Sequence, residues 1–152
     1  MTTRGRLIFS TVVIAMLLRA NVGIPNDNAS NDLLIIANTA VPVESITLDE
    51  ARRYFLMKKN QWPGGIKVLP INAVSGSSLR KAFLSRVLNK SPSEERMYFE
   101  DEKLRKGIVP PPEFRNVEKA VFKLKGSIGY TFRSDFTAGV SKVLLVVPAI
   151  AP

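Results

Sequence analysis

A run of small polar residues stands directly before an amphipathic pattern in the stretch NAVSGSSLRKAFLSRVLNK, residues 72–90. The residues of this run that can present hydroxyl or backbone N–H donors are Ser75, Gly76, Ser77 and Ser78. The first amides of a helix lack intrahelical partners and lie at the positive end of its dipole, so such a loop can receive an anion. Arg80 follows on the first turn and can add a charge-assisted hydrogen bond. Plain helix capping, with Arg80 as an ordinary solvated side chain, is the alternative interpretation, and both stay open.

A second pair of candidate ligand contacts follows a continuous apolar run. LLIIAN at residues 33–38 is continuous in hydrophobicity and bounded by turn-forming residues, which predicts a central strand buried on both faces. Ligands of α/β proteins gather outside the carboxyl ends of the strands, so Asn38 and Thr39 are candidate contacts. Turn formation is their alternative role.

The composition excludes most catalytic chemistry. The chain has no cysteine and no histidine, which removes disulfides, thiolate and imidazole metal ligands, and histidine as a general base. Ser78 and Lys81 have the S-x-x-K spacing of penicillin-recognising enzymes, but the K-T-G motif that belongs with it is missing. Adjacent carboxylates such as Asp49 and Glu50 point to different sides of a helix and form no acid–base pair. We therefore expect a protein that is not an enzyme, with no catalytic residues, no metal and no cofactor.

Strand and helix patterns alternate along the chain and position these residues. Capping signals predict helix starts at Thr47, with Glu50 behind it, and at Ser91, with Glu94 behind it. The apolar positions of the helix that follows the serine loop are Leu79, Ala82, Phe83 and Val87, with the stem of Arg86. Further strands are predicted at 66–71, 127–132 and 142–147, and a last helix at 117–124. This alternation predicts one helix-covered, largely parallel α/β sheet.

The N-terminus has the features of an export signal. Arg4 and Arg6 precede the apolar run LIFSTVVIAMLL at residues 7–18. Roughly 20 apolar residues are needed to span a bilayer, so a removed signal peptide is the favoured interpretation, and an uncleaved amphiphilic tail is the alternative. We expect a signal peptide over residues 1–23, cleaved between Gly23 and Ala29, a periplasmic or secreted protein, and membrane contact only through this segment.

The positive charge does not indicate nucleic-acid binding. The formal net charge is +9, and without the three arginines of the signal segment 19 basic residues stand against 13 acidic ones. This excess is spread through mixed-charge stretches such as SEERMYFEDEKLRK, residues 93–106, which are typical of solvated helix faces. No basic patch is interleaved with aromatic residues. We expect no nucleic-acid partner, while small anions are attracted by the overall field.

Three stretches together resemble one lobe of the phosphate-type periplasmic substrate-binding proteins of ABC transporters. They are LLIIANTAVPVESITLDEARRYFLMKKNQWPGGIKVLPIN, SSLRKAFLSRVLNKSP and GSIGYTF, within a domain at residues 33–147. The resemblance implies a three-layer αβα sandwich with a mixed, mostly parallel sheet. It also implies that a Ser-Gly-Thr loop at a helix N-terminus, with a nearby arginine, holds a tetrahedral oxyanion. Ser75-Gly76-Ser77 or Ser77-Ser78-Leu79 corresponds to that loop, and Arg80 is the substitute for the arginine, since Ile71 or Ala73 stands at its usual position.

Two functions follow from this resemblance. The first is an exported solute-binding module that takes phosphate or a similar oxyanion for an ABC transporter permease. About 120 residues form only one lobe, so a second lobe, a second subunit or another protein must supply the opposite wall of the ligand site. The alternative is an interaction or regulatory module of the cell envelope that keeps the lobe fold without binding solute.

Overall fold

The central strand of the protein is apolar at every position. The computed structural model describes residues 30–149, and in it β1 (Leu33–Ala37) is fully buried. The main sheet has four strands in the order β2-β5-β1-β6, so β1 has a neighbour on each side. An uninterrupted apolar sequence suits a strand that is covered on both faces. The prediction of a central strand here is confirmed.

The direction of the strands differs in part from the prediction. β5 (Ser127–Phe132) and β6 (Lys142–Val147) both pair with β1 in antiparallel fashion. Parallel pairing is confined to β2 (Leu69–Pro70) with β5, and to β3 (Asn72–Ala73) with β4 (Glu113–Phe114) in a second, two-stranded sheet. The mixed α/β fold is confirmed, but a mostly parallel sheet is wrong. An alternation of strands and helices implies parallel pairing only between strands that one crossover helix connects. The two neighbours of β1, β5 and β6, come from far along the chain, so the alternation does not fix their direction.

Local signals at the helix ends predicted the helices well. Helix α2 (Leu48–Phe55) begins with the Thr47–Glu50 capping box, and α4 (Pro92–Lys106) begins with the Ser91–Glu94 box. The remaining helical segments are α3 (Ser78–Phe83), the π-helix η1 (Leu84–Leu88), α5 (Val117–Lys123) and the 3-10 turn η2 (Arg133–Asp135). The strand predicted at residues 66–71 is shorter than expected. β2 is an edge strand, and the missing N–H of Pro70 is tolerated there because the bonds to β5 come from the amides of Leu69 and Ile71, at 3.1 and 2.8 Å.

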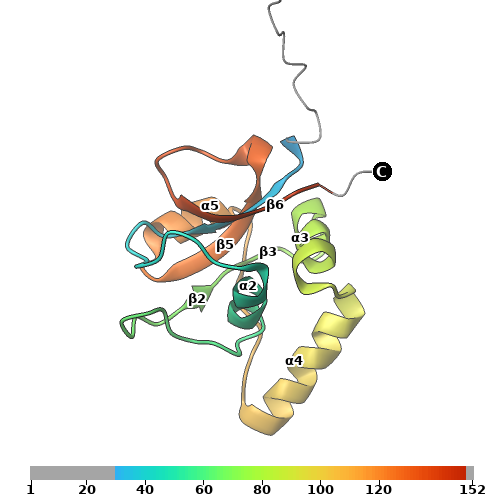
Figure 1. Cartoon of the computed structure of the whole chain (residues 1–152). Coiled ribbons are helices and arrows are strands. Elements are labelled where there is room, and N and C mark those ends of the chain that lie inside the picture. The colour runs from blue at the N-terminus through green and yellow to red at the C-terminus, as the bar shows by residue number, and fades with distance from the viewer. Residues whose placement is uncertain (1–29, 150–152) are drawn as a thin grey trace, which may run out of the picture.

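Two successive residues of β5 face opposite sides of the sheet, and each side is covered by helices. Gly129 faces α5, and a Cβ atom at this position would lie 2.5 Å from Val117 Cγ1 and 2.8 Å from Val121 Cγ2. Tyr130 points to the opposite face, where its ring stacks on Phe83 with a centroid distance of 3.8 Å. Helix α5 therefore covers one face of the sheet, and α3 with α2 covers the other (Figure 1). The predicted αβα sandwich is confirmed.

The helix after the serine loop buries a face that is rotated from the predicted one and shares Phe83 and Val87 with it. Its buried residues are Arg80, Phe83, Leu84, Val87 and Leu88, whereas Leu79 and Ala82 are only half-buried. Two causes account for the rotation. The π-helical turns change the angular spacing of the second half. Arg80 is also accommodated inside, because a carboxylate from α4 neutralises it.

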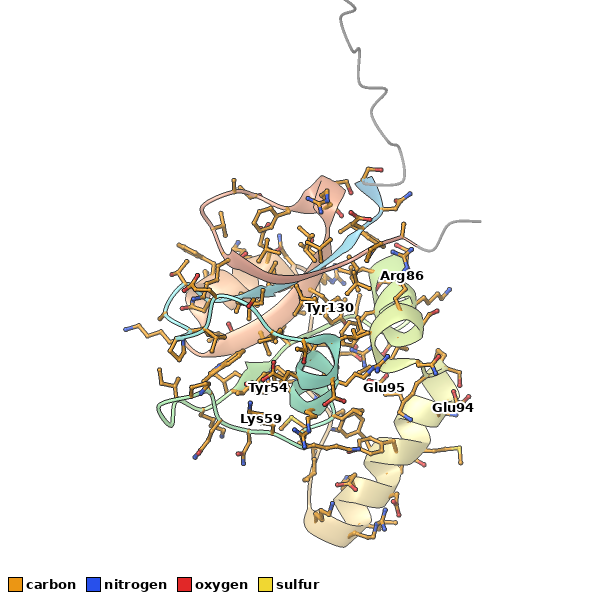
Figure 2. The ribbon with its side chains drawn as sticks, viewed as in Figure 1. Tyr54, Lys59, Arg86, Glu94, Glu95 and Tyr130 are labelled. Carbon is orange, nitrogen blue, oxygen red and sulfur yellow. The ribbon has the colours of Figure 1, made fainter. Side chains whose placement is uncertain are left out.

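Helix α4 projects from the body of the protein, and the chain that follows it runs back toward the sheet (Figure 1). Only three of its residues are buried, namely Glu95, Phe99 and Glu102. Figure 2 shows Glu95 pointing toward the body and its neighbour Glu94 pointing away. The position of α4 therefore depends on a few side chains near its N-terminal half.

The predicted signal peptide, residues 1–23 with cleavage up to Ala29, lies outside the described residues. Within residues 30–149, none of the helices combines the length and the apolar character that a membrane crossing requires.

The close approach of α5 to the sheet generates a prediction. We expect Gly129→Ala to lower the free energy of unfolding by about 1–3 kcal/mol, because the added methyl group overlaps Val117 and Val121. Urea denaturation measures the change. Lys119→Ala, on the exposed side of the same helix, is the control and should change stability by less than about 0.5 kcal/mol. A Gly129→Ala protein as stable as the wild type would refute this packing.

Candidate functional site

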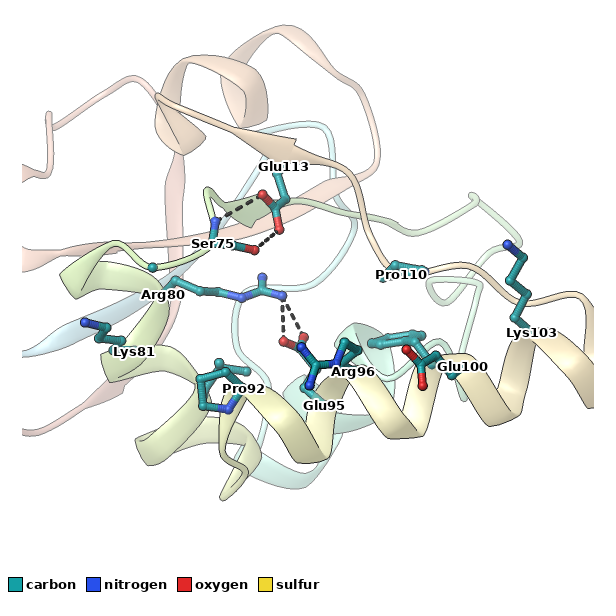
Figure 3. Close-up of a pocket in the computed structure, with 13 residues that line it drawn as sticks. Ser75, Arg80, Lys81, Pro92, Glu95, Arg96, Glu100, Lys103, Pro110 and Glu113 are labelled. Atoms are coloured by element: carbon teal, nitrogen blue, oxygen red, sulfur yellow. Dashed lines mark hydrogen bonds and ion pairs between the residues drawn. The ribbon is translucent and has the colours of Figure 1, made fainter.

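A pocket of about 430 Å³ lies between the loop before α3, helix α4 and the segment that leads into β4 (Figure 3). Its lining includes three of the seven residues predicted to contact a ligand, Ser75, Gly76 and Arg80. The pocket has a polar end formed by these residues, an apolar wall, and a row of basic side chains along its rim.

The polar end already holds a carboxylate. The Ser75 hydroxyl donates to Glu113 Oε1 at 2.5 Å, and the Ser75 amide donates to Glu113 Oε2 at 3.0 Å. The pairing of β3 with β4 brings Glu113 to this place, opposite Asn72. The Ser75 hydroxyl bond holds the pKa of Glu113 below its ordinary value against the effect of partial burial, and the Ser75 amide and the charge of Arg80 act in the same direction. The loop therefore binds an oxyanion group, and the protein itself provides that group.

Arg80 is buried and forms an ion pair. Its Nη2 donates to both carboxylate oxygens of Glu95, at 2.7 and 2.8 Å, and its Nη1 donates to the Tyr130 hydroxyl at 3.1 Å. Arg80 is 5% exposed and Glu95 is 8% exposed. Burial by itself lowers the pKa of Arg80, but the Tyr130 hydroxyl and the Glu95 carboxylate raise it above the ordinary value. Arg80 is thus a charged group with a dedicated partner, and the interpretation as a solvated side chain does not describe it.

The Tyr130 hydroxyl connects this ion pair to the sheets. It accepts a hydrogen bond from the Ala73 amide at 2.9 Å and donates to Asn72 Oδ1 at 3.3 Å. Burial raises the pKa of the Tyr130 phenol, so the hydroxyl keeps its proton at neutral pH. One network therefore links α4, α3, β5 and β3 directly behind the pocket.

Ser77 caps helix α3. Its hydroxyl accepts from the Arg80 amide at 3.1 Å and donates to the Val74 carbonyl at 2.8 Å. Ser78 is the exposed first residue of the helix. Gly76 has a φ of +81°, a left-handed conformation that suits glycine at this bend. The capping interpretation is thus observed for Ser77, while contact of the serine run with a ligand stays a prediction.

Asn38 and Thr39 do not join the pocket. The Asn38 amide donates to the carbonyls of Val121 and Phe122 at 2.9 Å each, which closes the C-terminal end of α5. Thr39 is exposed beside it. Because β1 is antiparallel to β5, it ends where β5 begins, while the chain through β2 leads to Ser75 at the other end of the sheet. The two groups of candidate residues therefore lie at opposite ends of the sheet.

The rest of the pocket comes from residues that the sequence analysis did not select. Its apolar wall consists of Leu84, Pro92, Phe99 and Pro110. The basic side chains at its rim are Lys81, Arg96 and Lys103, and none of these three forms an ion pair within the described part of the chain. The sequence did indicate that Arg80 needs a carboxylate partner such as Glu95. Arg80 lies three residues before Phe83 and four before Leu84, so it shares their face, and a buried arginine requires a carboxylate.

Comparisons with known proteins identify the fold. No protein-family model matches the sequence, and no curated protein is detectably similar to it. The structure is similar to PstS from Borrelia burgdorferi, with a TM-score of 0.56 at 17% identity over 74% of this chain. It is also similar to an ABC-type phosphate transport receptor from Vibrio cholerae, with a TM-score of 0.59 at 15% identity over 77% of this chain.

The chain spans less than half the length of these two structures, 46% and 47% of their chains. It therefore has the fold of one lobe, or part, of a phosphate-type substrate-binding protein. The family resemblance read from the sequence is confirmed at the level of the fold.

The Arg80–Glu95 pair generates a stability prediction. We expect Glu95→Gln to lower the free energy of unfolding by about 3–5 kcal/mol, because it leaves the buried guanidinium without a counter-ion. Arg80→Met combined with Glu95→Gln should cost clearly less than the two single changes added together. Chemical denaturation of all four proteins completes the cycle, and strict additivity would contradict the pairing.

An exposed pair on the same helix provides the control for this cycle. Arg105 on α4 binds Asp101 and is 64% exposed, so Arg105→Gln should change stability by less than about 1 kcal/mol.

The Ser75–Glu113 contact generates a titration prediction. The lowered pKa of Glu113 means that this contact stabilises the fold above the ordinary glutamate pKa and is lost as pH falls through the lowered value. We expect Ser75→Ala to raise the pKa of Glu113, followed through the side-chain carboxyl carbon by NMR. Ser78→Ala removes a hydroxyl of the same loop that lies outside the pocket and should leave the titration unchanged. Identical Glu113 curves in wild type and Ser75→Ala would show that the contact does not form.

Proposed function

We propose that this chain is an exported, binding-protein-like module that binds phosphate or a similar oxyanion group at Ser75. The observation that supports the proposal is the carboxylate of Glu113, which the amide and hydroxyl of Ser75 already hold at the polar end of the pocket. A ligand oxyanion takes the place of that carboxylate. Gly76 borders the same position, and Arg80 contributes positive charge from behind it.

A ligand anion must displace the Glu113 carboxylate from Ser75, and this displacement limits the affinity of the protein for the ligand. Glu113 is ionised at neutral pH, as its pKa lies below the ordinary glutamate value, so a ligand anion competes with it for the two Ser75 donors and is also repelled by its charge. Glu113 lies on an exposed two-residue strand, which makes its side chain easy to move. Arg80 keeps its partner Glu95 throughout. We therefore expect weak binding by the isolated chain.

The partners follow from the size of the chain. A phosphate-sized ligand at Ser75 is covered on one side only, since the chain corresponds to less than half of the solved binding proteins it is similar to. A second lobe, a second subunit or an ABC transporter permease supplies the other wall. Export rests on the N-terminal signal pattern.

A second candidate function is an envelope module that binds another protein and no solute. The observation that favours it is that both anion-binding groups have partners within the chain, Ser75 with Glu113 and Arg80 with Glu95. A lobe with its donors occupied in this way is stable without solute. The surface that an opposite lobe would cover is then the surface for a protein partner.

Titration calorimetry with phosphate and sulfate separates the two functions. We expect weak binding to the wild type and roughly tenfold tighter binding to Glu113→Ala, because the competing carboxylate and its repulsion are gone. Adding Ser75→Ala to that variant should abolish the heat. Ser134→Ala, an exposed serine outside the pocket, is the matched control. No heat with either anion in wild type and Glu113→Ala would reject binding of inorganic oxyanions, and co-purification with an envelope protein would then support the second function.

A further inference from the structure

We infer that the ligand of this pocket is an organic anion, with one phosphate or carboxylate group on an apolar body. Inorganic phosphate and sulfate are then partial ligands that fill only the polar end. This inference rests on the proposed function and specifies the class of molecule that the same site takes.

The size of the pocket favours a molecule larger than a simple oxyanion. Its volume of about 430 Å³ falls in the range of roughly 300–1,000 Å³ that encloses drug-sized ligands. Inorganic phosphate has only five non-hydrogen atoms and leaves most of this space to water. Most of the lining lies beyond Ser75, along α4 and the segment before β4 (Figure 3).

The apolar wall indicates what fills the remainder. Leu84, Pro92, Phe99 and Pro110 line the pocket, and no oxyanion gains from contact with them. Phe99 is 4% exposed and comes from the projecting helix α4, apart from the main hydrophobic core. The water-exposed part of the wall is Pro92 and Pro110, since Leu84 is 2% exposed. An aromatic or branched aliphatic group in contact with these prolines removes apolar surface from water on both sides.

The charges at the rim indicate an anion. Lys81, Arg96 and Lys103 have no ion-pair partner within residues 30–149, whereas Arg80 is paired. Arg96 and Lys103 are seven residues apart on α4, so they lie on one face about 10 Å apart along the helix. Glu100, between them, offsets part of this charge. A ligand with its anionic group at the Ser75 end and its apolar body against Pro92 and Pro110 is attracted by the combined field of Lys81, Arg96 and Lys103.

Phenyl phosphate is the probe that tests this inference against inorganic phosphate. We expect the full chain to bind phenyl phosphate at least tenfold more tightly than phosphate, and benzyl alcohol, which lacks the charge, not measurably. Pro110→Ser should weaken phenyl phosphate and leave phosphate unchanged, because it alters only the exposed part of the apolar wall. Arg96→Gln combined with Lys103→Gln should weaken phenyl phosphate about tenfold, while Lys119→Gln combined with Lys125→Gln, remote from the pocket, should not.

The outcomes separate this inference from the proposed function. Equal affinity for phosphate and phenyl phosphate overturns the inference and leaves the proposed function intact. Phenyl phosphate binding that is insensitive to Pro110→Ser and to the Arg96/Lys103 pair also overturns it, since the ligand then lies elsewhere. Absence of binding by both anions, in wild type and in Glu113→Ala, rejects both proposals. Amide shift mapping with phenyl phosphate gives a second readout on unaltered protein, in which the shifts should cluster on α4 and at Ser75.

Discussion

The buried guanidinium of Arg80 imposes the constraint on which the pocket depends. A charge removed from water requires a partner of opposite sign with good hydrogen-bond geometry, and Glu95 provides it with both carboxylate oxygens. Because Glu95 belongs to α4, neutralising Arg80 holds an otherwise projecting helix against α3. The Tyr130 hydroxyl extends the same network to the sheet. A buried ion pair is weak evidence for high stability, but this one ties α4 to α3, and the Tyr98 hydroxyl adds a bond from α4 to the Leu56 carbonyl at 2.9 Å. Helix α4 held in this way forms one wall of the pocket.

Two carboxylates of the chain itself, Glu113 and Glu95, occupy the groups of this lobe that could bind an anion. A surface that carries convergent N–H and O–H donors beside a buried cation attracts an anion, and here Glu113 and Glu95 supply two. The protein is therefore complete without a ligand, yet the contact at Ser75 involves an exposed residue on a minimal strand and is the easier of the two to exchange. The Arg80 pair maintains the architecture, while the Ser75 contact is the one that we propose a ligand replaces.

Local features were predictable from the sequence and long-range ones were not. The burial of β1 and the capping boxes at Thr47 and Ser91 depend on residues within one segment, and they are observed as expected. The direction of β1 relative to β5 depends on contacts across about 90 residues, and the antiparallel pairing puts Asn38 at the opposite end of the sheet from the serine loop. The sequence around Glu113 did not indicate its contact with Ser75. Glu113 follows a proline-rich connection, and only the pairing of β3 with β4 sets the path of that connection.

The most direct test of this account is side-chain NMR of the arginine guanidinium groups in the full chain at neutral pH. We predict that the Nη protons of Arg80 give separate, slowly exchanging signals, because rotation and contact with water are blocked by Glu95 and Tyr130. The exposed Arg96, on the rim of the same pocket, serves as the internal reference for a free guanidinium. Averaged, rapidly exchanging signals for Arg80 like those of Arg96 would contradict the ion pair, and with it the placement of α4 and the pocket.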